Sequence, residues 1–401
     1  MLFDTLNVVV GGQFGSESKG RVAADLVDRA RAYRNGTVYS VRVAGPNAGH
    51  VVVGKNGEHL AMRQLPVGFI NPDAMLVIAA GSEVDEEVLL SEIRMVEAAG
   101  YSVRDRLLIS PEATILEPHH IEQEKAADLN GKVGSTAKGI GAARADRIWR
   151  NAQRVADDVE FGCGVLTADN IREWLPEVRR ARREGRTTHV VIEGTQGYGL
   201  GLHAGHYPQC TSSDCRAIDF LAMAGTMPWE AEEFAVHVVV RPNPIRVAGN
   251  SGELKGETTW EDLNLPPERT TVTKKIRRVG QFDLDLVREA VQANGGPERV
   301  MIHLAMADTI DPTLCDLDPD APSQEYLERL LTGPLADVTR DLFSVAQVAA
   351  LGLGPNRTQW LEGFYEVDDT VYYLSSLARN ENLIRPYVRG PRSVEEENNR
   401  G

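Results

Sequence analysis

Residues 6–21 read LNVVVGGQFGSESKGR, and this stretch decides the fold. The apolar, β-branched run from Leu6 to Val10 predicts a buried strand. Four glycines follow within the next ten residues, and glycine allows positive φ angles and a close approach of several N–H groups to one anion. Lys19 adds a positive charge near the start of the next helix. The stretch therefore predicts a strand, a phosphate-binding loop and a helix.

The polar side chains of this loop distinguish it from a plain connecting turn. A turn that only joins a strand to a helix would account for the glycines, but it has little need of Gln13, Glu17 and Lys19 together. The loop is also not a Walker A sequence, because Gly-x-x-x-x-Gly-Lys-[Ser/Thr] cannot be aligned with it in register. Ser16 is unusual here, since its hydroxyl is chemically weak.

Five further β-branched runs predict strands of the same sheet. Most are continuous apolar stretches, which is typical of strands covered on both faces of a mainly parallel sheet. The segment from Asp85 to Ala99 has helical spacing of its apolar residues, an acidic first turn and Gly100 at its end. The fold class is therefore α/β, with a large, mainly parallel central sheet, flanking helices and long functional loops. The runs are residues 38–43, 75–80, 189–193, 234–240 and 299–306.

The chain shows no internal repeat and no Pro- or Ser-rich linker, so we expect residues 1–384 to form a single domain. Residues 385–401 are polar and end in EEENNRG, which predicts a mobile tail. No apolar run approaches the ~20 residues that a membrane span needs, and the start lacks a signal-like pattern. We therefore expect a cytoplasmic protein with no membrane partner.

The charge balance limits the partners further. The 401 residues include 43 Lys and Arg against 58 Asp and Glu, a net charge of −15, which argues against nucleic acid as a general partner. Anionic ligands must then meet local basic clusters, and two exist, at residues 144–150 and 273–278. A solvated helix face or loop explains an isolated cluster equally well. The four cysteines lack zinc-finger spacing, so we expect them to be reduced and structural.

Three more glycine-containing motifs follow the first loop. They read GPNAGH at residues 45–50, GSTAKGIG at residues 134–141 and EGTQG at residues 193–197. Each lies just past a strand or in a loop, where α/β enzymes build their sites. With the first loop they resemble the adenylosuccinate synthetase family, whose marks include Gly-x-Gln-Trp-Gly-Asp-Glu-Gly-Lys-Gly-Lys, Asn-Ala-Gly-His, Gly-Thr-Thr-x-x-Gly-Ile-Gly-Pro, Glu-Gly-Ala-Gln-Gly and Val-Thr-Ser-Ser-Asn. The resemblance keeps the family's order from about residue 8 to residue 357.

The resemblance implies a ligase that works in two steps. A nucleoside triphosphate phosphorylates the 6-oxo group of a purine monophosphate, and the amine of aspartate then displaces that phosphate at C6. The order is chemically sound, because an oxo group is a poor leaving group and phosphate is a good one. His50 matches the family's general acid, and the carbonyl of Gly49 matches a ligand of Mg²⁺. Arg150 matches an arginine that reaches the neighbouring subunit's ligand, so the resemblance also implies a homodimer.

The resemblance assigns the other site residues by position. Catalytic roles fall on Ser16, His50 and Gln196, and ligation of Mg²⁺ falls on Ser16 and Gly49. The donor phosphates would be held by Gly12, Gly15, Glu17, Ser18, Lys19 and Gly20. The purine monophosphate would be held by Ser16, Asn47, Thr136, Arg150, Gln196, Thr211 and Lys275. Aspartate would be held by Val272, Thr273 and the guanidinium of Arg277, and the base of the donor by Asp308 and Gly354.

Ser16 departs from the family pattern. Synthetases that act on inosine monophosphate (IMP) carry Asp here, and that carboxylate removes the purine N1 proton and binds Mg²⁺. A hydroxyl is no base at pH 7 and is a shorter, neutral metal ligand. A dead enzyme fits poorly, because His50, Lys19 and Arg277 remain. The serine instead resembles the branch of 2-aminoadenylosuccinate (N6-succino-2-amino-2'-deoxyadenylate) synthetases, which act on dGMP in making diaminopurine nucleotides.

We interpret the serine in terms of space and proton handling. A hydroxymethyl group in place of a carboxylate leaves room beside N1 and C2 of the purine for a 2-amino group. The N1 proton would then pass to water or to Glu17.

Two further departures concern the donor base and the sugar. Residues 304–308 read LAMAD, where the family segment Leu-Thr-Lys-Leu-Asp reads the guanine of GTP, so Met306 replaces a lysine while Asp308 stays. We therefore expect ATP or dATP as the donor and leave GTP open. Lys275 and Ile276 replace arginines, one of which contacts the ribose in the family. This is compatible with a deoxyribose and leaves a ribose open.

The leading hypothesis is a ligase that joins L-aspartate to dGMP with ATP, in a host cytoplasm if the source is viral. The nearest alternative is an adenylosuccinate synthetase that uses IMP and GTP, with Ser16 compensated. A regulatory nucleotide-binding protein would keep the phosphate loop but has no need of His50 or Arg277.

Overall fold

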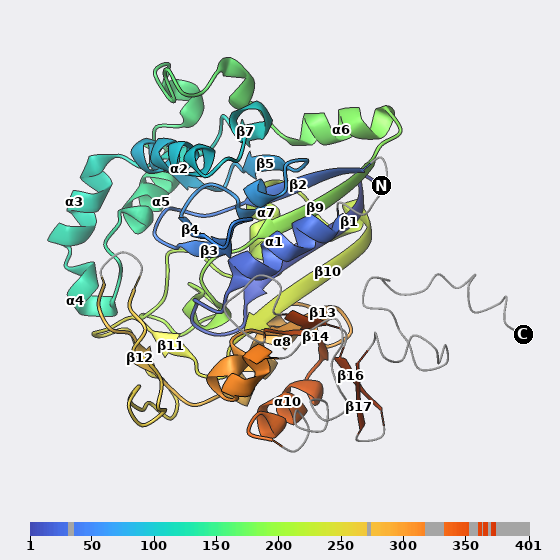
Figure 1. Cartoon of the computed structure of the whole chain (residues 1–401). Helices are drawn as coiled ribbons and strands as arrows, with labels where there is room; N and C mark the ends of the chain where they lie inside the picture. Colours follow the sequence, from blue (N-terminus) through green and yellow to red (C-terminus); the bar gives the residue numbers. More distant parts are fainter. Residues whose placement is uncertain are drawn as a thin grey trace, which may run out of the picture.

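The computed structural model describes residues 1–30, 36–270, 274–316, 333–352, 360–362, 364–367 and 370–373. One sheet runs through the middle of the molecule (Figure 1). Eight of its strands are parallel, and the edge strand β15 runs antiparallel to β14. The strand order is β15 (Trp360–Glu362), β14 (Gln347–Gly352), β13 (Val300–Leu304), β10 (Ala231–Val240), β1 (Phe3–Gly11), β9 (Thr187–Glu193), β2 (Gly36–Arg42), β5 (Met75–Ile78) and β7 (Leu107–Ile109).

Helices cover both faces of this sheet, and two apolar clusters mark the two layers. Leu6 and Val8 of β1 belong to the cluster under α6 (Leu175–Arg183), α7 (Ala217–Ala224), α8 (Leu284–Ala293) and α10 (Ala336–Phe343). Val9 belongs to the cluster under α1 (Lys19–Arg29), the 3-10 turn Val67–Ile70 and α2 (Glu86–Ala98). Successive side chains of a strand point to opposite faces, so this central strand is buried on both sides.

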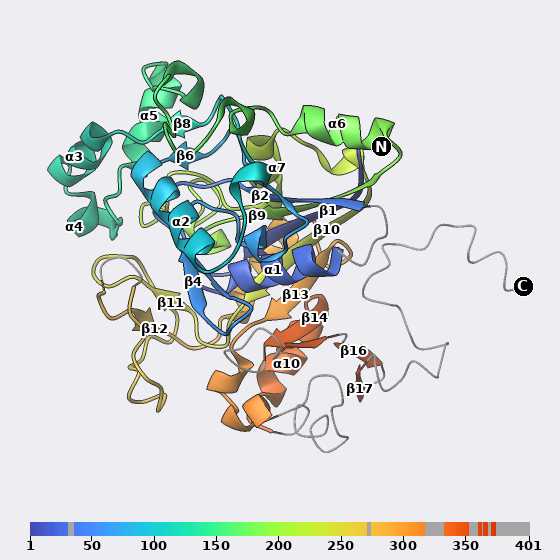
Figure 2. The ribbon, with the colours of Figure 1, turned by 45° about the horizontal axis from the view of Figure 1, so that its top comes forward.

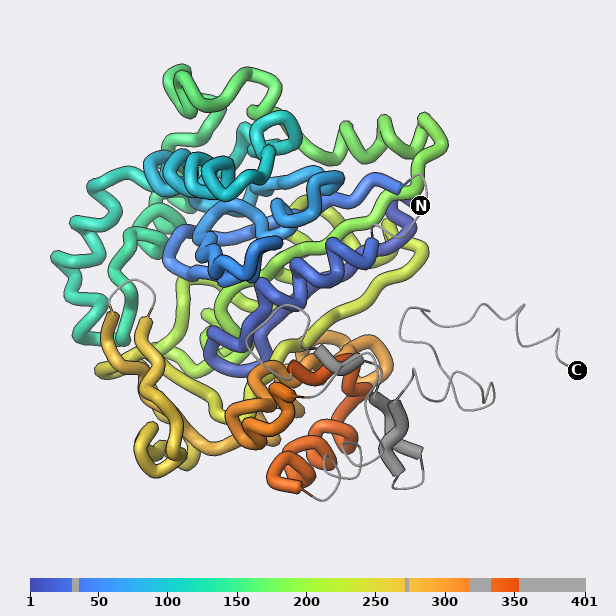
Figure 3. Tube along the Cα trace, in the orientation of Figure 1, coloured from blue at the N-terminus to red at the C-terminus, as the bar shows by residue number. Residues whose placement is uncertain are grey.

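The remaining elements lie around the sheet. Helices α3 (Pro118–Ala126), α4 (Leu129–Val133) and α5 (Ile140–Trp149) form one flank, as Figure 2 shows from a second direction. Figure 3 traces this flank in teal, with the yellow segment that carries β11 and β12 at the periphery below it. The four small sheets pair β3 (His50–Val53) with β4 (His59–Met62), β6 (Glu83–Val84) with β8 (Thr114–Ile115), β11 (Ile245–Arg246) with β12 (Arg278–Val279), and β16 (Phe364–Val367) with β17 (Thr370–Tyr373).

The structure confirms the α/β fold class and each of the six predicted strands, as β1, β2, β5, β9, β10 and β13. The predicted helix is α2, and the side chain of Asp85 caps it by accepting a hydrogen bond from the Val88 amide at 3.1 Å. The other three strands of this sheet, β7, β14 and β15, were not predicted, because their apolar runs are short. All four cysteines are free.

The single domain over residues 1–384 stays a prediction, and the tail 385–401 lies outside the described residues. In the described parts of the chain, no helix combines the length and the apolar character that crossing a membrane requires.

The carboxyl ends of the parallel strands meet at one edge of the sheet. The predicted motifs leave the sheet there, since the first loop follows β1, GPNAGH follows β2, and EGTQG overlaps the end of β9. Ligands of open α/β sheets bind beyond this edge. The fold therefore gathers motifs that lie far apart in the sequence.

Candidate active site

The first loop folds back on itself between β1 and α1. Gly15, Ser16 and Ser18 have φ angles of 89°, 61° and 70°, so three of its residues adopt the left-handed conformation. The EGTQG turn packs directly against the loop, because a Cβ on Gly197 would lie 2.6 Å from the carbonyl of Gln13 and from the amide of Gly15. Only glycine fits this contact.

The loop contains an anion site, and a carboxylate of the chain itself occupies it. Oε1 of Glu17 accepts hydrogen bonds from the amides of Gly15 at 2.7 Å and Gln13 at 3.2 Å. Oε2 pairs with Nζ of Lys19 at 2.6 Å, and both side chains are buried. Two N–H groups and an ammonium around one anion form the arrangement that binds a phosphate oxygen. The carboxylate of Glu17 thus stands where a phosphate group would find its donors.

Behind the loop, His50 belongs to a buried charge cluster. Its Nδ1 hydrogen-bonds to Oε1 of Glu193 at the end of β9 and lies 3.0 Å from Nη1 of Arg42. Glu193 also accepts from Nη1 of Arg42 and from the amide of Val67, the latter at 3.0 Å. Arg42 and Glu193 are 1% and 0% exposed. We call Arg42, His50 and Glu193 the strand cluster, because they lie on or beside β2, β3 and β9.

Electrostatics keep this cluster in one charge state. Burial, with the charge of Arg42 beside it, lowers the pKa of His50 to about 4, while Glu193 opposes the shift. Burial would raise the pKa of Glu193, but Arg42 and His50 hold it below its usual value. At pH 7 the carboxylate is therefore charged and the imidazole neutral. Since Glu193 holds the Nδ1 proton, Nε2 is the ring nitrogen left for a ligand.

The first turn of α1 ties the strand cluster to the loop. A Cβ on Gly20 would lie 2.6 Å from Cβ of His50. The histidine therefore packs directly on the helix that begins at Lys19, and the structure brings together His50 and the donor-phosphate residues named from the sequence.

Ser16 lies where the loop meets a second segment, of which the structure describes residues 268–270 and 274–277. Its Oγ accepts a hydrogen bond from Nη1 of Arg277, and its backbone oxygen accepts one from Nη1 of Arg241 at 3.3 Å. Arg241 forms an ion pair with Glu268, and the carbonyl of Glu268 accepts the amide of Arg277 at 2.8 Å. These four residues form a closed ring that we call the loop cluster.

The predicted purine side lies around the N-terminus of α5. Thr136 and Thr211 are half-buried, and Cβ of Ser212, next to Thr211, lies 3.7 Å from where a Cβ of Gly141 would be. The carboxylate of Glu124 caps α5 by accepting the amides of Gly139 and Gly141, both at 2.7 Å.

The other predicted purine residues take different positions. Gln196 has a φ of 60° in the turn that packs on the first loop, and Asn47 is half-buried. Gly49, the predicted Mg²⁺ ligand, and Lys275 are exposed.

The basic cluster 144–150 divides into two parts. Arg144 pairs with Glu83 at 2.7 Å and Arg147 with Glu112 at 3.1 Å, so these two arginines are already partnered within the chain. Arg150 follows α5 with a φ of 65° and is exposed, beside the exposed Ile148 and Trp149. Arg150 is thus the member of the cluster that faces outward.

At the donor-base side, Asp308 lies in the 3-10 turn Ala307–Thr309 after β13. Burial raises its pKa, and the charge of Arg21 opposes this. Met306 begins the turn with a φ of 60°. The predicted residues Val272, Thr273 and Gly354 lie outside the described residues.

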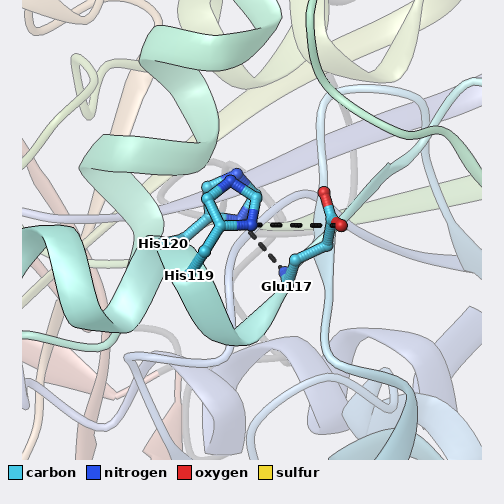
Figure 4. Close-up of side chains that lie close together, drawn as sticks. All are labelled: Glu117, His119 and His120. Carbon is cyan, nitrogen blue, oxygen red and sulfur yellow. Dashed lines mark hydrogen bonds and ion pairs between the residues drawn. The ribbon is translucent and has the colours of Figure 1, made fainter.

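One cluster with metal-ligand spacing occurs elsewhere in the described residues. It joins Glu117, His119 and His120 at the start of α3 (Figure 4), and Asp146 of α5 lies 3.2 Å from Nε2 of both histidines. Nδ1 of His120 accepts the Glu117 amide at 3.0 Å, so its proton lies on Nε2 and is donated to Asp146. A metal would need that Nε2 lone pair. We therefore interpret the cluster as hydrogen bonding between α3 and α5.

Several of these residues were not singled out from the sequence. No motif marks four of them, and each forms hydrogen bonds or ion pairs with residues distant in the sequence: Arg42, Arg241, Glu268 and Glu124. Glu193 stands in a quoted motif, but its role as the partner of His50 emerges only from the fold.

The sequence also matches a known protein family. The family model described as adenylosuccinate synthetase matches residues 8–162 and 165–314. The adenylosuccinate synthetase of Thermococcus sibiricus is 37% identical over 308 residues, which covers 76% of this chain and 84% of the relative.

Two solved structures are also similar. The succinoaminodeoxyadenylate synthetase (PurZ) of cyanophage S-2L, bound to dGMP and to dATP as an energy donor, superposes with a TM-score of 0.73 and 26% identity, covering 90% of this chain and 96% of that one. The fully ligated adenylosuccinate synthetase from Plasmodium falciparum has a TM-score of 0.69 and 20% identity over 89% of this chain and 99% of its own, a likeness of fold alone.

Proposed function

The chain belongs to the adenylosuccinate synthetase family, C–N ligases that use a nucleoside triphosphate and aspartate, and from this premise we propose its substrates. It joins L-aspartate to C6 of dGMP with hydrolysis of ATP. The products are 2-amino-2'-deoxyadenylosuccinate, ADP and phosphate, in the synthesis of diaminopurine nucleotides.

Ser16 is the observation that carries the choice of purine. It is the site residue with a neutral, short side chain where the family motif has a carboxylate, and two arginines hold its Oγ and its backbone oxygen. A hydroxymethyl group leaves space for the 2-amino group of guanine. The similarity to the cyanophage synthetase, whose structure contains dGMP and dATP, supports the same choice.

The reaction needs two bond exchanges. The O6 atom of the purine takes the γ-phosphoryl group as the N1 proton leaves, and the donor departs as the diphosphate. The aspartate amine then attacks C6, the C6–O6 bond breaks, and phosphate leaves with its oxygen while the amine loses a proton. Catalysis of phosphoryl transfer rests mainly on positioning and charge stabilisation.

The first loop can supply both functions once the donor binds. A phosphate that takes the amides of Gln13 and Gly15 and the ammonium of Lys19 displaces the carboxylate of Glu17 from its three partners. The freed carboxylate lies next to Ser16 in the chain. We assign it as the acceptor of the N1 proton, directly or through water, in place of the missing aspartate.

His50 is the proposed general acid. With a pKa lowered to about 4, its imidazole is neutral in the ligand-free protein, so it must gain a proton to donate one. Phosphate dianions bound beside Nε2 raise that pKa, because a nearby negative charge favours the protonated ring. Glu193 holds the ring in position through Nδ1.

Mg²⁺ fits this site only together with the donor. Ser16 and Gly49 offer a hydroxyl and a carbonyl, both neutral oxygens, and Mg²⁺ is commonly bound by one or two protein oxygens plus substrate phosphates and water. When bound, the ion neutralises charge on the transferred phosphoryl group.

The other ligands follow from the charges at the site. Arg277 clamps a carboxylate of aspartate, with Val272 and Thr273 nearby in sequence, and Lys275 reaches the sugar of the monophosphate. Thr136, Thr211, Asn47 and Gln196 hold the rest of the nucleotide. Asp308 and Gly354 contact the donor base, for which we propose adenine, since the uncharged Met306 replaces a lysine of the guanine-reading segment.

We propose a homodimer in which Arg150 reaches the 5'-phosphate bound by the neighbouring subunit. The exposure of Arg150 beside Ile148 (69% exposed) and Trp149 (74% exposed) supports this, because exposed large apolar side chains next to an outward cation suit a protein interface.

An adenylosuccinate synthetase that uses IMP and GTP is the second candidate. The specific observation in its favour is the name of the curated relatives, of which that of Thermococcus sibiricus is 37% identical. This reading requires a base other than Ser16 for the N1 proton of IMP.

A substrate matrix tests the proposal. The purified protein is incubated with L-aspartate, with dGMP, GMP or IMP, and with ATP, dATP or GTP, and the products are identified by mass. We expect a succinyl adduct of dGMP with ATP or dATP. An adduct formed only from IMP would overturn the choice, and absence of aspartate-dependent phosphate release would overturn the ligase.

A further inference from the structure

The loop cluster connects two parts of the site that bind different substrates. Ser16 belongs to the donor and purine side, whereas Arg277 belongs to the segment assigned to aspartate. Arg241 and Glu268 complete the ring between them. Neither residue belongs to any motif of the sequence, and neither has a role in the reaction described above.

Arg241 is built into the core at the end of β10. It is 2% exposed, and the side-chain amide of Gln13 bonds to both its backbone oxygen, at 2.9 Å, and its backbone amide, at 3.0 Å. Its guanidinium donates to Ser16 and, through both terminal nitrogens, to Glu268. Arg241 therefore binds the first loop through Gln13 and Ser16, and it binds the segment that contains Arg277 through Glu268.

Glu268 orients Arg277 in two ways. Its carbonyl accepts the backbone amide of Arg277, and its carboxylate offsets the positive charge of Arg241 close to that of Arg277. Burial lowers the pKa of Arg277 and the charge of Arg241 lowers it further, whereas Glu268 opposes both. A carboxylate beside two neighbouring guanidinium groups, of which that of Arg241 is buried and that of Arg277 half-buried, offsets their mutual repulsion.

The Nε atom of Arg277 is buried and has no hydrogen-bond partner within the described residues. Nη1 of the same group is engaged by Ser16. The guanidinium is thus anchored at one corner and has an unsatisfied donor at another, which is the state of a group prepared to receive a carboxylate.

We propose that Arg241 and Glu268 are positioning residues for aspartate: they hold Arg277 against Ser16 so that its free guanidinium edge faces the aspartate carboxylate. This rests on the proposed function, since it takes Arg277 as the aspartate ligand. In this proposal Arg241 and Glu268 act on aspartate through Arg277 rather than by binding it themselves.

The proposal predicts an effect on the KM for aspartate that the KM of the nucleotide donor does not share. Loss of the ion pair between Arg241 and Glu268 lets Arg277 move away from Ser16. Part of the binding free energy of aspartate is then spent on ordering Arg277 again. The donor phosphates still bind Lys19 and the loop amides. The KM for aspartate should therefore rise without a matching rise in the KM of the donor.

Steady-state kinetics of Glu268→Gln, Arg241→Met and Arg241→Lys test this, with Glu257→Gln as matched control. Glu257 pairs with Arg278, the residue next to Arg277, but takes no part in the loop cluster. We expect Glu268→Gln and Arg241→Met to raise the KM for aspartate about tenfold, the loss of one charged hydrogen bond. The KM of the donor should stay within about twofold, and Arg241→Lys should recover part of the loss.

The outcomes are distinguishable. If Arg241→Met fails to fold, Glu268→Gln still decides, because it keeps the shape of the side chain. An unchanged KM for aspartate in Glu268→Gln, or equal rises in every KM in all variants including Glu257→Gln, overturns the positioning role alone, provided that the wild type turns over. A wild type without aspartate-dependent phosphate release overturns the proposed function and this inference with it.

Discussion

The strand cluster and the loop cluster both surround one side chain with an arginine and a carboxylate, but they differ in how deeply the carboxylate is buried. Each places arginine and carboxylate around one functional side chain, His50 in the first and Ser16 in the second. In the strand cluster Glu193 is 0% exposed and is fixed by the sheet, whereas in the loop cluster Glu268 is 33% exposed and belongs to no strand. In the proposed reaction, the acid–base chemistry common to the family lies in the buried strand cluster, and the choice of purine lies in the more exposed loop cluster.

The largest effect is expected from breaking the strand cluster. The substitution His50→Asn removes the proposed general acid but keeps a polar group of similar size, so kcat should fall about 10²- to 10⁴-fold. Single-turnover phosphate release measures it. A fall of less than about threefold, with an unchanged melting temperature, would mean that another group supplies the proton.

The next effect concerns the functional residue of the loop cluster. The substitution Ser16→Asp places a carboxylate against Arg277 and Arg241, fills the space proposed for the 2-amino group and restores a base for N1. We expect the ratio of kcat/KM for dGMP to that for IMP to fall about 10- to 100-fold, the discrimination typical of one polar contact or steric conflict in a pocket. An unchanged ratio would remove Ser16 as the determinant of specificity.

Acidic pH should lower the stability that the strand cluster contributes through His50. His50 has a pKa of about 4 in the folded protein and about 6.5 when unfolded, so between these values only the unfolded chain binds its proton. The free energy of unfolding therefore falls as pH falls from 6.5 to 4, by about 1.4 kcal/mol per pH unit for this group.

Urea unfolding of the wild type and of His50→Asn at pH 7 and pH 5 measures how much His50 contributes to the pH dependence of the free energy of unfolding. The buried His237 and His303, whose pKa values are also lowered, add a dependence of the same sign in both proteins. The variant should thus lose less stability than the wild type between the two pH values, and equal losses would contradict the charge state assigned to His50.

The smallest effect is expected at Arg150, outside both clusters. Because Arg150 is exposed and its proposed contact is with the neighbouring subunit's ligand, Arg150→Ala should raise the KM for the purine monophosphate about three- to tenfold and leave the strand cluster intact. Mixing Arg150→Ala with a subunit inactivated by His50→Asn should change activity if the arginine acts across subunits. No change on mixing would contradict that role.

Much of the fold is readable from the sequence, because its signals are local. Continuous β-branched runs give the parallel strands, and the glycines after Val10 give the loop. The motifs likewise mark His50, whose role in catalysis stays a prediction. The fold confirms that these motifs meet at one edge of the sheet.

The partnerships of charged residues are not readable in the same way. Arg241 and Glu268 are 27 residues apart and meet Ser16 only through the fold. Glu17 reads as a donor-site residue, yet its carboxylate turns back to the loop amides, because the loop residues Gly15, Ser16 and Ser18 have positive φ angles. In a chain with 101 charged side chains, long-range pairing cannot be assigned from spacing alone.

The central claim is that the neutral Ser16 makes this ligase a dGMP enzyme. It is tested most directly by letting the wild-type protein choose between equal concentrations of dGMP and IMP, with L-aspartate, ATP and GTP present, and by counting the two succinyl adducts by mass. We predict that the dGMP adduct dominates at least tenfold in early turnover, a difference of about 1.4 kcal/mol in transition-state binding. An excess of the IMP adduct would contradict the account.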